Sequence, residues 1–167
     1  MPRFLVAYYS LTGNTSKVSA EIAQRLSADV EVITEVKPRK GVFAALRAVY
    51  EAVFDRIPAI KPAARDVGSY DVVILGFPIW AQKAATPMRA YVVREKDKFP
   101  PIAGFCTEGG SGGDKALRKL SEQAGKSMTA ELIITESELK SEAWRTKVDK
   151  FVRALPVSAA SQAEPVL

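Results

Sequence analysis

The apolar residues of the chain occur in two patterns that alternate along its length. Short runs that are almost continuously apolar, or that alternate with polar residues, predict strands at residues 4–9, 30–36, 70–76, 101–106 and 130–135. Between these runs, apolar residues recur every three or four positions, which is the spacing of an amphipathic helix. This spacing predicts helices at about residues 14–26, 42–57, 114–124 and 144–155, with a further helix starting at Thr86-Pro87.

The order of these elements predicts the fold class. Strands that alternate with helices indicate an α/β protein, a three-layer αβα sandwich with a five-stranded parallel sheet. The length of 167 residues fits one domain, which we expect to span residues 1–155. Residues 156–167 are small or polar and include proline, so a disordered C-terminal tail is predicted there.

The turn between the first strand and the first helix has an unusual composition. It reads Ser10, Leu11, Thr12, Gly13, Asn14 and Thr15, with three hydroxyl groups, one amide and no positive charge. Hydroxyls and free backbone N–H groups at a helix start suit a phosphate group. The turn lacks the Gly-Lys-Ser/Thr of a nucleoside-triphosphate loop and the G-x-G-x-x-G of a dinucleotide loop. The alternative is that Thr12 or Asn14 merely caps the helix.

Two further segments follow predicted strands and share the carboxyl edge of the sheet with this turn. After the third strand, Trp80 stands beside Pro78 and suits contact with a flat ring, although it could also be a hydrophobic plug. After the fourth strand, residues 107–113 include four glycines. Glycines let backbone N–H groups face a ligand, although these could also form a flexible link before the next helix.

These residues resemble the flavodoxin family. Ser-x-Thr-Gly-Asn-Thr at 10–15 is similar to the FMN-phosphate loop of flavodoxins. Pro-Ile-Trp at 78–80 followed by Thr-Pro, and Phe-Cys-Thr-x-Gly-Gly-Ser-Gly at 105–112, look like short-chain members of that family. The resemblance covers residues 3–155, and it implies strand order 2-1-3-4-5 with FMN at the switch between strands 1 and 3.

Carried over by position, the resemblance implies three groups of FMN contacts. The phosphate group would be bound by Ser10, Leu11, Thr12, Gly13, Asn14 and Thr15. The flavin ring would be lined by Pro78, Ile79 and Trp80, and its polar edge would meet Thr107, Glu108, Gly109 and Gly110. Many flavodoxins place an aromatic side chain from the third loop on the ring, but residues 107–113 contain none. One face of the flavin is therefore expected to be open.

The helix predicted at 42–57 has a broad apolar stripe that includes Phe43, Tyr50 and Phe54. We interpret this stripe as the face that covers the sheet. A lid over a ligand and a dimer surface are the alternatives.

The amino-acid composition excludes several kinds of catalytic and metal site. The chain has no histidine, which excludes Ser/His and Cys/His nucleophile pairs and argues against a metal site. Its single cysteine, Cys106, is expected to be a small buried apolar residue and fits a reducing cytoplasm. No apolar stretch approaches the ~20 residues of a membrane span. The first strand begins almost at the N-terminus, so no signal or transit peptide is expected.

The formal net charge of +5 comes from scattered basic residues, a distribution that does not indicate nucleic-acid binding. It suits an anionic nucleotide, whereas flavodoxins that carry electrons between proteins are generally acidic. The sequence therefore favours an NAD(P)H-dependent, FMN-containing reductase of quinone-like acceptors, with a homodimer possible. An electron carrier for partner proteins and a cofactor-free interaction module are the alternatives. No side chain stands out as a catalytic acid or base.

Overall fold

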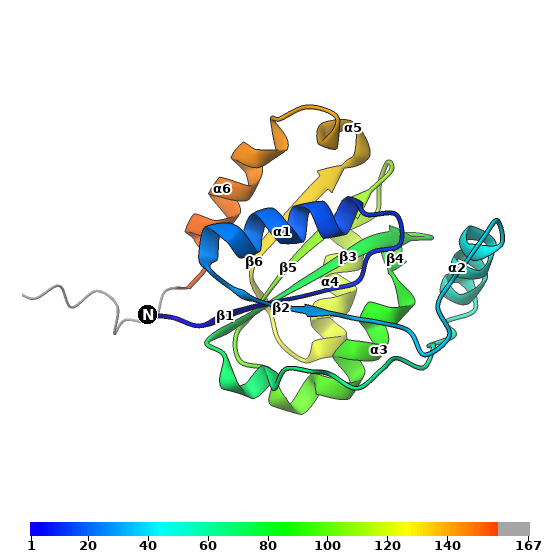
Figure 1. Ribbon diagram of the computed structural model, residues 1–167, viewed down its shortest axis with the longest axis horizontal. Coiled ribbons are helices and arrows are strands. Elements are labelled where there is room, and N and C mark those ends of the chain that lie inside the picture. Colours follow the sequence, from blue (N-terminus) through cyan, green and yellow to red (C-terminus); the bar gives the residue numbers. More distant parts are fainter. Residues whose placement is uncertain (157–167) are drawn as a thin grey trace, which may run out of the picture.

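The computed structural model describes residues 1–156 and has a parallel sheet at its centre (Figure 1). The sheet order is β2-β1-β3-β5-β6, which confirms the predicted order of the five main strands. These strands are β1 (Phe4–Tyr8), β2 (Asp29–Val32), β3 (Val72–Trp80), β5 (Ile102–Glu108) and β6 (Met128–Thr135). A sixth strand, β4 (Lys83–Ala84), runs antiparallel to the end of β3. The predicted tail lies outside the described residues, apart from Pro156.

Two layers of helices enclose the sheet, as predicted. One layer contains α1 (Asn14–Leu26) and α6 (Trp144–Ala154), and the other contains α3 (Thr86–Glu95) and α4 (Gly113–Ala124). A short helix, α5 (Glu136–Leu139), follows β6, and single 3₁₀ turns occur at Val67–Ser69 and Lys96–Lys98.

Alternating side chains of the central strands build two separate cores. Val6 and Ile74 pack in the core that includes Val18 of α1. Their neighbours Leu5 and Leu75 pack in the core that includes residues of α3 and α4. Successive residues of a strand point to opposite faces, so a strand covered on both faces must be apolar throughout.

The connection after the third strand is more regular than predicted. The sequence indicated a loop at residues 77–85, but β3 continues to Trp80 and turns back into β4. Ala81 and Gln82 form the turn with φ angles of 48° and 61°, the positive values that a tight two-residue hairpin requires. The hairpin thus projects Trp80 beyond the carboxyl edge of the sheet on paired backbone.

The second helix does not cover the sheet, so that interpretation of the sequence is wrong. Helix α2 (Ala44–Val53) is shorter than predicted and lies beyond the ends of the strands, apart from the layer formed by α3 and α4 (Figure 1). The following extended segment does the covering instead: Ile60 forms a bridge with Glu35, and Ile60 and Ala63 pack on the core. With that face of the sheet occupied, α2 is displaced outward.

Candidate functional site

The first turn of α1 is open to a ligand. Gly13 precedes the helix with a φ of 100°, no side chain caps the helix, and its first turn carries no acidic residue. The alternative, that Thr12 or Asn14 caps the helix, is therefore wrong. Ser10 Oγ accepts a hydrogen bond from the Gly13 N–H at 3.1 Å, and nothing lies within 4 Å of the position that a Gly13 Cβ would occupy. The partial positive charge of the helix N-terminus consequently faces open space, where an anion is stabilised.

A buried hydrogen bond joins this turn to the third predicted segment. The hydroxyls of Thr15 and Thr107 lie 2.8 Å apart, and each residue is less than 5% exposed. Thr107 in turn stands opposite Pro78 in the register of β5 on β3. The structure therefore brings the three segments together at one edge. Thr15 forms the base of the site, whereas Thr12 and Gly13 are exposed at its surface.

Trp80 is held in a fixed orientation at the hairpin and remains partly exposed. The ring of Tyr9 meets it edge-on, with 5.5 Å between centroids and planes at 90°. The guanidinium carbon of Arg39 lies 4.7 Å from the centre of the indole ring, in cation–π geometry. The neighbouring Pro78 and Ile79 are also half-buried. The hairpin thus presents an apolar, rigid wall next to the open N-terminus of α1.

Arg39 is the centre of a buried polar cluster that the sequence did not reveal. Its side chain is fully buried, lies 2.9 Å from Glu35 and donates a hydrogen bond to Glu51 of α2. It also donates to Thr86 Oγ1 at 3.2 Å, so the Thr86 hydroxyl is used here and does not cap α3. The Tyr9 hydroxyl donates to Glu35 at 3.1 Å.

Burial and charge pairing shift the pKa values of Arg39, Glu51 and Tyr9. Burial opposes the charge on Arg39, but the hydrogen bond to Glu51 and the nearby Glu35 outweigh it and raise its pKa. Burial likewise opposes ionisation of Glu51, but hydrogen bonds from Arg39 and Arg47 lower its pKa below the ordinary value. Burial, followed by the charge of Glu35, raises the pKa of Tyr9. The cluster therefore keeps Glu51 ionised against Arg39, which also lies against Trp80. The i,i+4 spacing of Arg47 with Glu51 on the predicted helix was the available sequence signal, and it concerns only one side of the cluster.

In the third segment, residues 107–113, the backbone at the tip is accessible to a ligand, whereas the Glu108 side chain points into the protein. Gly109 and Gly110 are exposed, and nothing lies within 4 Å of the position of a Gly110 Cβ. The carboxylate of Glu108 turns inward and accepts a hydrogen bond from the Gly113 N–H at 2.7 Å, at the start of α4. The Glu108 carboxylate is therefore used within the protein, while the backbone at Gly109 and Gly110 is open to a ligand. Gly112 has a φ of 110°, and a Cβ at this position would lie only 3.0 Å from the Cα of Gln82, so the hairpin leaves no room for a side chain there.

Among the described residues, neither Cys106 nor a metal-binding cluster contributes a reactive group to the site. Cys106 is buried in the core, as predicted, and burial raises the pKa of its thiol. Across residues 1–156, no group of three or more His, Cys, Asp and Glu side chains could hold a metal ion. Within the same range, no helix is both long and apolar enough to cross a membrane.

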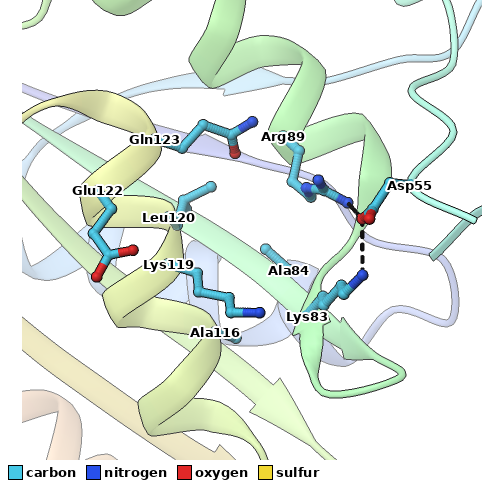
Figure 2. A pocket seen from close by; sticks show the side chains of 9 residues that line it. All are labelled: Asp55, Lys83, Ala84, Arg89, Ala116, Lys119, Leu120, Glu122 and Gln123. Atoms are coloured by element: carbon cyan, nitrogen blue, oxygen red, sulfur yellow. Dashed lines mark hydrogen bonds and ion pairs between the residues drawn. The ribbon is translucent and has the colours of Figure 1, made fainter. Parts of the chain in front are cut away.

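A cavity of about 490 Å³ lies elsewhere, between α3, α4 and β4 (Figure 2). Asp55 binds Lys83 at 2.8 Å and Arg89 at 3.0 Å at its rim, and Lys119 and Glu122 line the α4 side. None of the residues predicted for the functional site lines this cavity. Because this cavity lies apart from the three converging segments, we take those segments as the candidate functional site.

Known proteins share this architecture. The profile of a family described as flavodoxin matches residues 3–152 of the chain. No curated protein sequence matches it. A flavoprotein from Lactobacillus acidophilus NCFM, solved in complex with FMN, superimposes with a TM-score of 0.71 at 19% identity, covering 90% of this chain and 99% of that chain.

Two other solved structures extend the comparison. A flavoprotein from Bacteroides eggerthii DSM 20697 gives a TM-score of 0.69 at 24% identity, covering 89% of this chain and 99% of that chain. An NADH:FMN oxidoreductase in its apo form gives a TM-score of 0.56 at 16% identity, covering 99% of this chain and 98% of that chain. At these identities the likeness concerns the fold.

Proposed function

The chain belongs to the flavodoxin family, and we propose that it binds FMN non-covalently as a redox cofactor. The observation that carries this proposal is the uncapped N-terminus of α1, which lies beside Thr107 and the Trp80 hairpin. A phosphate monoester carries roughly −1.5 to −2 charges at neutral pH, and a helix N-terminus offers about half a positive charge. The phosphate group of FMN is therefore matched to this turn although the turn has no lysine or arginine.

The residues present fit the whole cofactor. The exposed Thr12 hydroxyl and the N–H groups of the first turn of α1 would hold the phosphate. Trp80, with Pro78 and Ile79, would line one side of the flavin ring system. The backbone around Gly109 and Gly110 would meet the polar edge of the ring. The open space at Gly13 and Gly110 leaves room for close approach at both ends of the site.

We further propose that the protein is an NAD(P)H-dependent reductase of quinone-like acceptors. FMN supplies reversible one- and two-electron transfer, while the protein supplies position and electrostatics. Residues 107–113 contribute no aromatic side chain, so the wall opposite Trp80 leaves space for a nicotinamide and then for an acceptor. The net charge of +5 favours approach of an anionic nucleotide. An NADH:FMN oxidoreductase with this fold gives the proposal a precedent. Since the single thiol fits a reducing compartment, we place the activity in the cytoplasm.

Stopped-flow mixing of the FMN-loaded protein with NADH and with NADPH tests the reductase. We expect rapid loss of the oxidised-flavin absorbance with at least one nucleotide, and its return when benzoquinone is added. If neither nucleotide bleaches the flavin while dithionite reduces it in two resolved one-electron steps, the protein is an electron carrier and the reductase proposal fails.

A cofactor-free interaction module on the same fold is the alternative from another class. It predicts a colourless purified protein whose spectrum does not change when FMN is added. The open first turn of α1 weighs against it, since a helix start without a cap is left unsatisfied unless water or a ligand binds there.

A further inference from the structure

Helix α2 is amphipathic, but its polar side faces the protein and its apolar side faces solvent. Glu51 is 8% exposed and pairs with Arg39 and Arg47, while its neighbours Ala48 and Ala52 are buried. On the outer side, Leu46 is 66% exposed. This arrangement reverses that of an ordinary surface helix, whose apolar side packs on the core.

The outward side chains form a continuous apolar surface, which we call the α2 patch. Its members are between 48% and 90% exposed, and they are Val42, Phe43, Leu46, Val49, Tyr50, Val53, Phe54 and Ile57. Together they expose on the order of 800 Å², whereas the largest apolar patch on a typical monomer is roughly 300–600 Å². The rings of Tyr50 and Phe54 pack on each other with centroids 4.7 Å apart, so part of the patch is already ordered.

Ion pairs and hydrogen bonds fix α2 in this outward position. Lys83 of β4 donates to the carbonyl of Ala52 at 3.2 Å and pairs with Asp55, which also binds Arg89 of α3 (Figure 2). At its other side the helix is bound through Glu51 to the buried Arg39. The sheet face that α2 could otherwise cover is occupied by Ile60 and Ala63. The patch therefore cannot be buried by folding α2 back onto the sheet.

We propose that the α2 patch is the interface of a homodimer, in which α2 packs antiparallel against α2 of a second copy about a twofold axis. A standard interface buries about 800 Å² on each partner, which matches the size of the patch. Its members are aromatic and aliphatic, and the guanidinium of Arg56 lies over the Tyr50 ring, 5.8 Å from its centre. Aromatic residues and arginine are both enriched in protein interfaces. A twofold axis at the middle of α2 makes the surface complementary to itself, because the same side chains come from both copies.

The charge distribution distinguishes a second copy from a lipid surface. A helix that binds the membrane interface presents a lysine- and arginine-rich face to the headgroups. In α2 the charged face is Arg47 and Glu51, which point toward the protein and neutralise each other with Arg39 and Glu35. Arg56, just after the helix, lies over the Tyr50 ring, but α2 itself has one basic residue, Arg47, which is paired. Because α2 lacks a lysine- and arginine-rich face, the patch fits an apolar protein surface better than an anionic bilayer.

The dimer interface adjoins the candidate functional site. Arg39 joins Glu51 of α2 to the indole ring of Trp80, and Lys83 lies in the same hairpin as Trp80. A second copy would therefore bound the site on its Trp80 side. The inference stands on α2 alone and does not depend on FMN binding.

Sedimentation velocity of the full chain tests the proposal. We expect the wild type to sediment as a dimer and the variant Leu46→Glu/Val53→Glu as a monomer, because the substitutions bury four like charges in the dimer. The matched control is Val93→Glu on α3, where the native side chain is 52% exposed but outside the patch, and it should remain dimeric. A monomeric wild type at every accessible concentration, or a dimeric double variant, would overturn the proposal.

Disulfide crosslinking tests the antiparallel α2 dimer even if the double variant does not fold. Val49 is 52% exposed near the middle of α2, so an antiparallel pair brings its two copies together. Val49→Cys should form a covalent dimer on mild oxidation, whereas Val93→Cys should not, and the buried Cys106 gives no background. Absence of a Val49→Cys crosslink in a dimeric protein overturns the antiparallel arrangement. Co-sedimentation of a monomeric wild type with phosphatidylglycerol vesicles would assign the patch to lipid instead.

Discussion

The hydroxyl groups of Thr15 and Thr107 lie 2.8 Å apart at the buried base of the candidate site. One residue belongs to the first turn of α1 and the other to the end of β5, so they are 92 positions apart in the chain. Their hydrogen bond joins the phosphate turn to the glycine-containing segment. It fixes the distance between the two ends of the site before any ligand binds, which lowers the conformational cost of binding.

Replacing these threonines by valine should give a non-additive pattern. Thr15→Val or Thr107→Val alone leaves one buried hydroxyl without its partner, which costs about 1–3 kcal/mol of unfolding free energy. The double variant removes both polar groups with little change of shape, so it should be no less stable than either single variant. Urea unfolding of the four proteins measures the coupling. Simple addition of the two single effects would show that the hydroxyls do not interact.

An acidic residue at the start of α1 should stabilise the protein and weaken FMN binding. The first turn has no acidic side chain, so Asn14→Asp places a negative charge at the positive end of the helix and adds about 0.3–1 kcal/mol to stability. The same charge repels the phosphate group of FMN but hardly affects riboflavin, which has none. Thermal unfolding of the apoprotein and titrations with both flavins measure these opposite effects. A parallel change in affinity for FMN and riboflavin would show that the phosphate binds elsewhere.

The sequence predicted much of this arrangement because its strongest signals are local. The apolar runs around Val6 and Ile74 predicted strands covered on both faces, and the composition of residues 10–15 located the open start of α1. The position of α2 could not be predicted, because the helical spacing of Leu46 and Val53 identifies an apolar face but not what that face contacts. Whether Ile60 or α2 covers the sheet depends on competition between distant segments.

The buried cluster under Trp80 escaped prediction for a similar reason. Arg39 lies in the connection between the strand predicted at 30–36 and the helix predicted at 42–57, and only the fold brings it to Glu51 and Thr86. The direction of the Glu108 side chain was equally hidden. Its sequence position suggests a ligand contact, whereas its carboxylate is used to bind the Gly113 N–H.

Removing the Arg39 side chain should destabilise the protein strongly. Arg39→Met leaves the carboxylates of Glu35 and Glu51 buried without their main counter-charge, which costs about 3–5 kcal/mol. Arg47→Met is the matched control, because Arg47 also pairs with Glu51 but is 39% exposed, and its loss should cost less than about 1 kcal/mol. Urea unfolding gives both values. Equal losses for the two variants would contradict the central role of Arg39.

Acid should destabilise the wild type more than the variant Glu51→Gln. Because the folded protein lowers the pKa of Glu51 below its ordinary value of 4.5, its stabilising contribution is present above that pH and is lost as the pH falls through the folded value. Glu51→Gln should be less stable at pH 7 but should lose less stability as the pH falls from 4.5 into the more acid range. Glu142→Gln, at a side chain that is 77% exposed, should keep the acid sensitivity of the wild type. Thermal unfolding of the three proteins across this pH range measures the difference. An equal loss of stability in the wild type and Glu51→Gln would contradict the prediction.

The most direct test of the central claim is an equilibrium titration of the apoprotein with FMN and with riboflavin, followed by flavin fluorescence. We predict that FMN binds with one site per chain, with a change in the emission of Trp80, and that riboflavin binds at least about tenfold more weakly because it lacks the charge-assisted hydrogen bonds to the α1 turn. Unchanged flavin fluorescence at saturating protein would contradict the assignment of the site. Equal affinities for the two flavins would contradict the role of the open N-terminus of α1.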